Sequence, residues 1–283
     1  MGSAPVVREG RPSRTAGLVA LGRAVADAGL SHVPGFADPT ARVFLNDKGK
    51  QSLAKITASK SGMRREMARG MGDLMALRTM AIDAAVRDAM ARGAQQLIIV
   101  GAGYDGRAWR MPELAGMRVF EVDQAATQAD KRRHLAELPP PAGAVSFVSV
   151  DLERESLDDV LARAGHDGAL PTCWIWEGVV MYLTRRAMGA TLAQMAGRSA
   201  PSSTLIVNYH TGHRGFLASL VYRLLGEPQI SAWTPEEMAA DLRSAGCSVR
   251  EDSSMADWNA RFAQGQAKVA RASYMRIAVA GTP

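Results

Sequence analysis

Two cysteines, no long apolar run and no block of like charges set the first limits on this 283-residue chain. Cys173 and Cys247 stand in apolar segments without metal-site spacing or a close partner, so we expect buried thiols and no metal centre. No apolar stretch reaches the roughly 18 residues that a membrane helix needs. The first residues contain no apolar core like that of a signal peptide. We therefore expect a cytoplasmic protein with no membrane partner.

The charge balance excludes a further class of partner. The net charge is +6, and we interpret the basic excess as Arg8, Arg11 and Arg14 near the start together with scattered surface positions. No basic stripe is interleaved with aromatic residues, as a nucleic-acid surface would require. We expect no nucleic-acid partner, and a monomer or a homodimer.

The first third of the chain is predicted to be helical. Residues 1–12 are rich in Gly, Pro, Ser and Arg without periodicity, which predicts a disordered tail. Apolar residues then recur at helical spacing through residues 13–92, and Gly93 ends the pattern. We expect this segment to form a helical cap packed on the remainder, residues 93–283.

Short apolar runs alternate with helical segments after Gly93. The runs at 97–100, 117–122, 145–150, 172–176 and 204–209 predict a parallel sheet with helical crossovers. Two later runs, at 247–250 and 275–280, are separated by no clear long crossover and predict an antiparallel pair at the sheet edge. The pattern predicts an α/β fold with a mostly parallel sheet of seven strands and an antiparallel C-terminal edge strand.

The stretch LIIVGAGYDGRAWRMPELAGMRVFEVD, residues 97–123, is the most informative part of the sequence. An apolar strand leads into a turn with Gly101, Gly103 and Gly106, where the lack of Cβ atoms lets a ligand approach the backbone. Glu121 follows the first glycine by twenty positions and ends a second strand. A carboxylate there can hold a ribose diol, so the stretch predicts a nucleoside site.

The glycine spacing by itself matches the dinucleotide fingerprint. Three features argue against a nicotinamide cofactor. They are the long helical segment before the turn, the bulky residues Arg107 and Trp109, and the antiparallel strands at the end. S-adenosylmethionine fits better, because its ribose suits Glu121 and it lacks a pyrophosphate. Asp151 and Leu152, directly after the third strand, suit the adenine amine and the ring face.

Several motifs together carry a resemblance to a known family. They are SRTAGLVALGRA at 13–24, Asp38-Pro39, ALRT at 76–79 with Asp83, VGAGYDGRAWR, FEVDQAATQADKR, Val150-Asp151-Leu152 and WEGVVMYLT at 176–184. In this order they resemble class I S-adenosylmethionine-dependent methyltransferases similar to leucine carboxyl methyltransferase, including bacterial polyketide O-methyltransferases. The resemblance implies a Rossmann-like core that binds S-adenosyl-L-methionine.

The resemblance also implies roles for individual residues. Arg78 would grip the cofactor carboxylate, Glu177 would lie near the methionine end, and Asp105 would orient Arg107 by a salt bridge. Glu121 would clamp the ribose. The full implied cofactor set is Arg78, Gly101, Gly103, Glu121, Val122, Gln124, Asp151, Leu152 and Glu177.

The acceptor side departs from the family pattern. Gly106 stands where threonine is more common, Tyr104 replaces an aliphatic residue, and Asn208-Tyr209 replaces Asp-Tyr. Tyr182 is expected to line the acceptor pocket. Our catalytic candidates are Tyr182, Tyr209 and His210, with His213 as a second candidate base.

We expect methyl transfer to an oxygen of a small molecule, a carboxylate or a hydroxyl, in specialised metabolism. A carboxylate acceptor is already ionised at neutral pH, whereas a hydroxyl would benefit from a general base. Three alternatives stay open. They are a cyclase or aminoalkyl transferase that releases methylthioadenosine, a nicotinamide-dependent oxidoreductase, and a non-enzymatic cofactor sensor.

Overall fold

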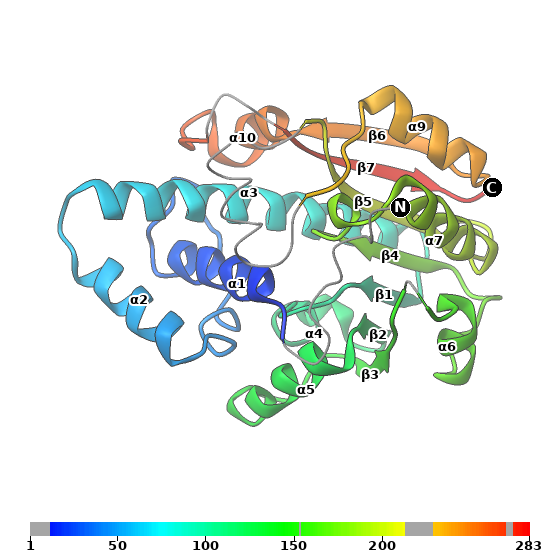
Figure 1. Cartoon of the computed structure of the whole chain (residues 1–283), viewed down its shortest axis with the longest axis horizontal. Helices are drawn as coiled ribbons and strands as arrows, with labels where there is room; N and C mark the ends of the chain where they lie inside the picture. The colour runs from blue at the N-terminus through cyan, green and yellow to red at the C-terminus, as the bar shows by residue number, and fades with distance from the viewer. Residues whose placement is uncertain (1–11, 153, 213–228, 270–273) are drawn as a thin grey trace, which may run out of the picture.

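The computed structural model describes residues 12–152, 154–212, 229–269 and 274–283. In this part of the chain, seven strands form one sheet in the order β3-β2-β1-β4-β5-β7-β6 (Figure 1). In chain order they are β1 (Gln96–Val100), β2 (Arg118–Asp123), β3 (Ala144–Ser149), β4 (Thr172–Trp176), β5 (Thr204–His210), β6 (Ser248–Ser254) and β7 (Met275–Gly281). Strands β1 to β5 pair in parallel, and β7 pairs antiparallel with both β5 and β6.

This sheet confirms the predicted fold class. The five predicted parallel strands are present with small shifts at their ends. Strands β1, β4 and β5 are short apolar runs buried on both faces, as parallel sheets require, whereas β3 lies at the edge and is largely half-buried. The late antiparallel pair is also present. Its order corrects one detail: β7 inserts between β5 and β6, so the outermost strand is β6 and not the C-terminal strand.

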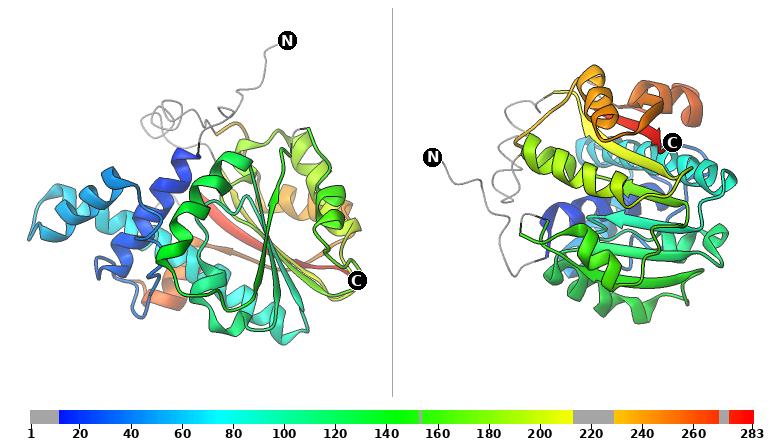
Figure 2. Two further views of the ribbon diagram at one scale, coloured as in Figure 1. Left: turned by 90° about the horizontal axis from the view of Figure 1, so that it is seen from below. Right: turned by 90° about the vertical axis from the view of Figure 1, so that its right-hand side faces the viewer.

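Alternation along the strands sends successive side chains into two hydrophobic clusters. Leu97 and Ile99 of β1 face a cluster that includes α3 (Met63–Ala91) and α10 (Met255–Ala263). Ile98 and Val100 face the opposite cluster, with α6 (Leu157–Arg163), α7 (Arg185–Gly197) and α9 (Pro235–Ser244). Helices therefore cover both faces of the sheet (Figure 2).

The remaining helices precede or join these elements. They are α1 (Arg14–Asp27), α2 (Asp47–Ala58), α4 (Arg107–Arg110) and α5 (Ala125–His134), with short 3₁₀ turns η1 (Pro112–Leu114), η2 (Leu135–Glu137) and η3 (Val180–Tyr182). Helix α1 packs along α3, whereas α2 projects away from the sheet (Figures 1 and 2). Buried side chains of α3 belong to the same cluster as β1, so the boundary predicted at residue 92 falls within a shared core.

Two further features bear on earlier expectations. None of the helices in the described part of the chain is long and apolar enough to cross a bilayer. Within the same residues, no group of three or more His, Cys, Asp or Glu side chains is arranged to hold a metal ion. The predicted disordered tail, residues 1–12, lies outside the described residues except for its last position.

Candidate functional site

The glycine turn lies at the carboxyl end of β1, between β2 and β4. The backbone N–H groups of Gly101 and Ala102 both donate to the carbonyl of Val122, at 2.8 and 3.1 Å. Gly101 has φ +68° and Gly103 has φ +50°, in the left-handed region that favours glycine. A Cβ on Gly101 would also overlap the side chain of Val179. The hydrogen bonds to Val122 of β2 therefore hold the turn in place, and only glycine fits at position 101.

Asp123 ends β2 directly beside this turn. Its Oδ2 accepts from the backbone N–H of Gly103 at 2.5 Å, and its Oδ1 accepts from that of Gln124 at 2.6 Å. The side chain is half-buried. Asp123 thus presents a carboxylate at the open edge of the sheet, in contact with the glycine turn. Gln124 is the half-buried residue that precedes α5.

Glu121 lies two residues before Asp123 in β2. Its side chain is completely buried, with Oε2 2.5 Å from Nζ of Lys131 on α5. Burial raises the pKa of Glu121 to about 7, although Lys131 acts in the opposite direction. Lys131 also donates to the carbonyl of Asp105 at 2.6 Å. The structure therefore places Glu121 in an internal ion pair, which does not fit the predicted ribose clamp.

Val122 is likewise removed from the open edge. Its side chain is fully buried in the hydrophobic cluster beneath α6 and α7, and only its carbonyl reaches the glycine turn. The family resemblance includes Val122 in the cofactor-binding set. The alternation of the strand instead directs it into the core.

Asp151 and Leu152 follow β3, the neighbour of β2, and so lie at the same edge of the sheet. Asp151 is half-buried, with its backbone N–H donating to Glu155 at 2.9 Å. Leu152 packs partly buried against the cluster beneath α6. The two residues therefore lie at the same end of the sheet as Asp123, on the strand next to β2.

Arg78 and Glu177 come from opposite sides of the site and meet. Arg78 is buried on α3, and its Nε lies 2.7 Å from Oε1 of Glu177, which follows β4. The second oxygen of Glu177 lies 3.0 Å from Nη1 of Arg107. Burial would raise the pKa of Glu177, but the two guanidinium groups hold it below its usual range. Glu177 is therefore a carboxylate at neutral pH.

A larger set of buried charges surrounds this pair. Arg107 contacts Asp105 and Asp83 as well as Glu177, so the predicted salt bridge between Asp105 and Arg107 is present. Arg110, next along α4, pairs with Asp83 at 2.6 Å. The network contains four arginines and four carboxylates, namely Arg23, Arg78, Arg107, Arg110, Asp38, Asp83, Asp105 and Glu177.

This network joins the N-terminal helices to the glycine turn. Arg23 of α1 lies 3.3 Å from Asp38 and donates to the carbonyl of Tyr104 at 2.6 Å. Asp38 also lies 3.7 Å from Arg110. Sequence reasoning did not identify Arg23 or Arg110. One signal in the sequence indicates such a network. The charged residues Arg78 and Asp83 occur among the buried apolar positions of α3, and a buried charge is normally paired with an opposite charge.

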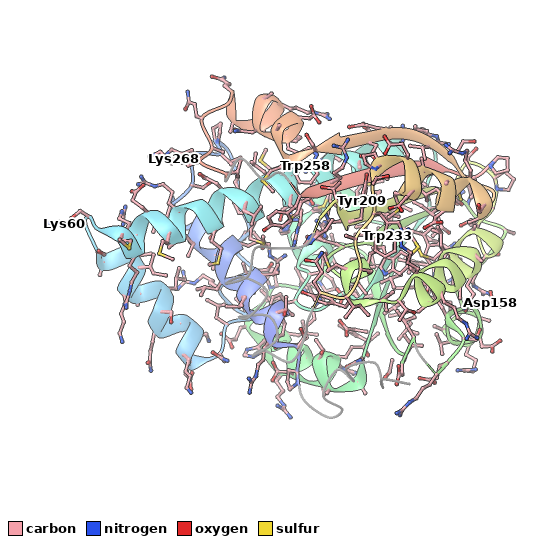
Figure 3. The ribbon with its side chains drawn as sticks, turned by 45° about the horizontal axis from the view of Figure 1, so that its top comes forward. Lys60, Asp158, Tyr209, Trp233, Trp258 and Lys268 are labelled. Carbon is pink, nitrogen blue, oxygen red and sulfur yellow. The ribbon has the colours of Figure 1, made fainter. Side chains whose placement is uncertain are left out.

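The three catalytic candidates have different environments. Tyr182 ends η3 and is half-buried, just after Glu177 in the chain. Tyr209 is fully buried, and its hydroxyl donates to Asp252 of β6 at 2.6 Å. His210 is also buried, with its ring against the edge of Tyr274. Figure 3 shows Tyr209 among the strands near Trp233. His213 lies outside the described residues.

Tyr209 is thus committed to a contact with the outer strand. Burial, followed by the hydrogen bond to Asp252, raises the pKa of its hydroxyl. Arg276 completes this group, with Nε 2.7 Å from the other oxygen of Asp252. A buried phenol that donates to a carboxylate is a poor proton acceptor, so Tyr209 is poorly suited to act as a base.

Comparisons with known proteins identify the family. The profile of the leucine carboxyl methyltransferase family matches residues 16–196. A protein of Mycolicibacterium gilvum, named provisionally as an S-adenosyl-L-methionine-dependent methyltransferase, is 35% identical over 76% of this chain and 71% of its own. A relative from Streptomyces coelicolor with the same provisional name is 34% identical, covering 71% of this chain and 70% of its own.

Solved structures support the fold. A DUF574 family protein from Streptomyces avermitilis gives a TM-score of 0.60 at 15% identity, covering 96% of this chain and 98% of that one. Magnesium protoporphyrin IX methyltransferase from Synechocystis, solved with S-adenosylmethionine bound, gives 0.50 at 12% identity over 88% and 99%. The family match spans more than half of the chain and includes the glycine turn, Asp123 and Glu177. The chain therefore belongs to the leucine carboxyl methyltransferase family.

Proposed function

We propose that this protein transfers the methyl group of S-adenosyl-L-methionine to a carboxylate oxygen of a small molecule. The single observation that supports the cofactor most directly is the placement of Asp123 against the glycine turn, at the edge shared with Asp151 and Glu177. The family match and the names of the relatives support the same cofactor.

The residues around the turn fit the parts of this cofactor. Asp123 would accept from the ribose hydroxyl groups, a role that the sequence analysis gave to Glu121. Asp151 and Leu152 would meet the adenine, with Gln124 beside the adenosine. Glu177, held ionised by Arg78 and Arg107, would attract the amino group of the methionine end, and Arg78 its carboxylate. The bound cofactor supplies the activated methyl group.

The choice of a carboxylate over a hydroxyl is supported by the environments of Tyr209 and His210. The phenol of Tyr209 is engaged by Asp252, and the ring of His210 is packed against Tyr274. An ionised acceptor needs no base, so the chain would only have to align it with the methyl group and exclude water. Tyr182 would line the acceptor pocket. We place this reaction in specialised metabolism in the cytoplasm, in a monomer or a homodimer.

Mass spectrometry of both products tests this proposal. The protein is incubated with S-adenosylmethionine and a panel of small carboxylic acids, each paired with the matching alcohol. We expect S-adenosylhomocysteine together with a methyl ester, and no ether from the alcohols. Methylthioadenosine would instead indicate attack on the aminoalkyl chain. A calorimetric titration that detects nicotinamide dinucleotide and no S-adenosylmethionine would overturn the cofactor.

A further inference from the structure

One projecting segment carries a large net positive charge. Residues 46–70, which we call the basic arm, comprise α2 and the first turns of α3 and carry seven basic and two acidic residues, a net charge of +5. The whole chain carries +6. The net charge of the basic arm is therefore close to that of the whole chain, although most of the individual basic residues are distributed elsewhere.

Within the described part of the chain, several of these cations have no ionic partner. Lys50 lies 3.7 Å from Glu137, and Arg69 pairs with Glu66 at 3.1 Å. Lys48, Lys55, Lys60 and Arg64 are exposed and form no ion pair with any described residue. Figure 3 shows Lys60 at the far end of the molecule from Asp158. The basic side chains without an ionic partner therefore extend to the tip of the basic arm.

Two exposed methionines lie on the same tip. Met63 is 81% exposed and Met67 is 70% exposed, one helical turn apart at the start of α3. The other large apolar side chains found exposed in the described residues, Leu18 and Ile230, reach only 36%. The most exposed apolar groups and the unpaired cations therefore occur together on a convex surface.

The chemistry of the arm disfavours three kinds of partner. A symmetric dimer through this surface would bring two arms of charge +5 face to face. Single-stranded nucleic acid is held by aromatic stacking platforms, and the chain contains no aromatic residue between Phe44 and Tyr104. Protein interfaces depend on buried aromatic anchors, which are absent here for the same reason.

An anionic bilayer surface needs none of these features. It attracts clustered Lys and Arg side chains over a Debye length, and it accepts flexible apolar side chains such as Met at the boundary between head groups and acyl chains. We propose that the basic arm docks the protein on anionic lipid bilayers, with Met63 and Met67 entering the interface. This peripheral contact needs no membrane-spanning helix, and it revises the expectation of no membrane partner.

Vesicle sedimentation of the full chain tests the proposal without any assay of activity. We expect the protein to sediment with vesicles of phosphatidylcholine containing about 30% phosphatidylserine and to remain in solution with phosphatidylcholine alone. Lys60→Gln/Arg64→Gln should weaken partitioning about 25-fold, because each basic group contributes about a factor of five. Met63→Ser/Met67→Ser should weaken it at unchanged net charge.

The matched control removes the same charge from the opposite end of the molecule. Arg163 and Arg243 are exposed at the ends of α6 and α9, so Arg163→Gln/Arg243→Gln should partition within about twofold of the parent. Equal losses in both double variants would overturn the docking site, as would no binding to anionic vesicles. Binding to heparin without binding to vesicles would also overturn the docking site, and would indicate an acidic macromolecule as the partner.

Discussion

Nζ of Lys131 lies 2.5 Å from Oε2 of Glu121, and neither side chain is more than 1% exposed. This pair sits beneath the glycine turn, since Lys131 also donates to the carbonyl of Asp105. Taking two charges out of water is costly unless they remain together. The pair should therefore determine stability in the region where the cofactor is expected to bind.

Removing one partner should be far worse than removing both. We predict that Lys131→Met lowers the free energy of unfolding by about 3–5 kcal/mol, because Glu121 is left as an uncompensated buried charge. The double variant Glu121→Leu/Lys131→Met should recover at least half of that loss. Urea unfolding of the parent, both single variants and the double variant gives the coupling energy. A coupling near zero would contradict an internal ion pair.

The two carboxylates of β2 should separate binding from stability. We predict that Asp123→Asn weakens S-adenosylmethionine binding at least tenfold, because charge-assisted bonds to the ribose contribute roughly 1.5–3 kcal/mol each. Glu121→Gln should change the affinity less than about threefold while lowering stability. Calorimetric titration measures the first effect and urea unfolding the second. The reverse order of affinities would return the ribose to Glu121.

Gly106 and Thr40 should behave as a coupled pair. A Cβ on Gly106 would overlap the hydroxyl of Thr40, which donates to Asp38 at 2.5 Å. We predict that Gly106→Ala costs about 1–3 kcal/mol through overpacking, and that adding Thr40→Gly offsets part of that cost. Thermal unfolding of the four proteins in the cycle measures the coupling. Additive effects would show that the two sites do not compete for space.

His166 should make stability fall in mild acid. Its Nδ1 accepts from Nε of Arg198 at 3.0 Å, and burial, followed by the charge of Arg198, lowers its pKa to about 4. A depressed pKa favours the neutral form, so the stabilisation is complete above the unfolded value of about 6.5 and is lost as the pH falls through about 4. The loss should be on the order of 2 kcal/mol.

Urea midpoints between these pH values check this effect. His166→Gln should be less stable than the parent at neutral pH, and its free energy of unfolding should decrease less than that of the parent as the pH is lowered. His134→Gln serves as the matched control, because His134 is a half-buried histidine at the end of α5, 3.6 Å from Glu137. If the parent and His166→Gln decline with the same slope, His166 does not govern the acid sensitivity.

The sequence predicted the parts of the fold that depend on short, contiguous segments. The apolar runs that became β1 to β5 have the length and content of buried parallel strands, and the left-handed glycines of the turn have no substitute. The order of the last two strands was not predictable in this way, because β7 pairs with β5 across more than sixty residues. Nothing local distinguishes an inner strand from an outer one.

The errors within the site have the same origin. Glu121 and Asp123 stand two positions apart on one strand, so both point to the same face of the sheet. Only Lys131, on a helix ten residues later, fixes which of them lies inside. Tyr209 ends a strand as an acceptor residue would, but its partner Asp252 comes 43 residues later. Contacts made outside the strand itself therefore give these residues their different environments.

The buried network of four arginines and four carboxylates makes the N-terminal helices inseparable from the rest. Truncation at residue 92 would strip Arg110 of both its carboxylates, Asp83 and Asp38, and would take Arg78 away from Glu177. It would also expose the face of the sheet that α3 covers. Residues 93–283 expressed alone should therefore yield an aggregating fragment, and any grafting of this catalytic body onto another scaffold must carry α1 and α3 with it.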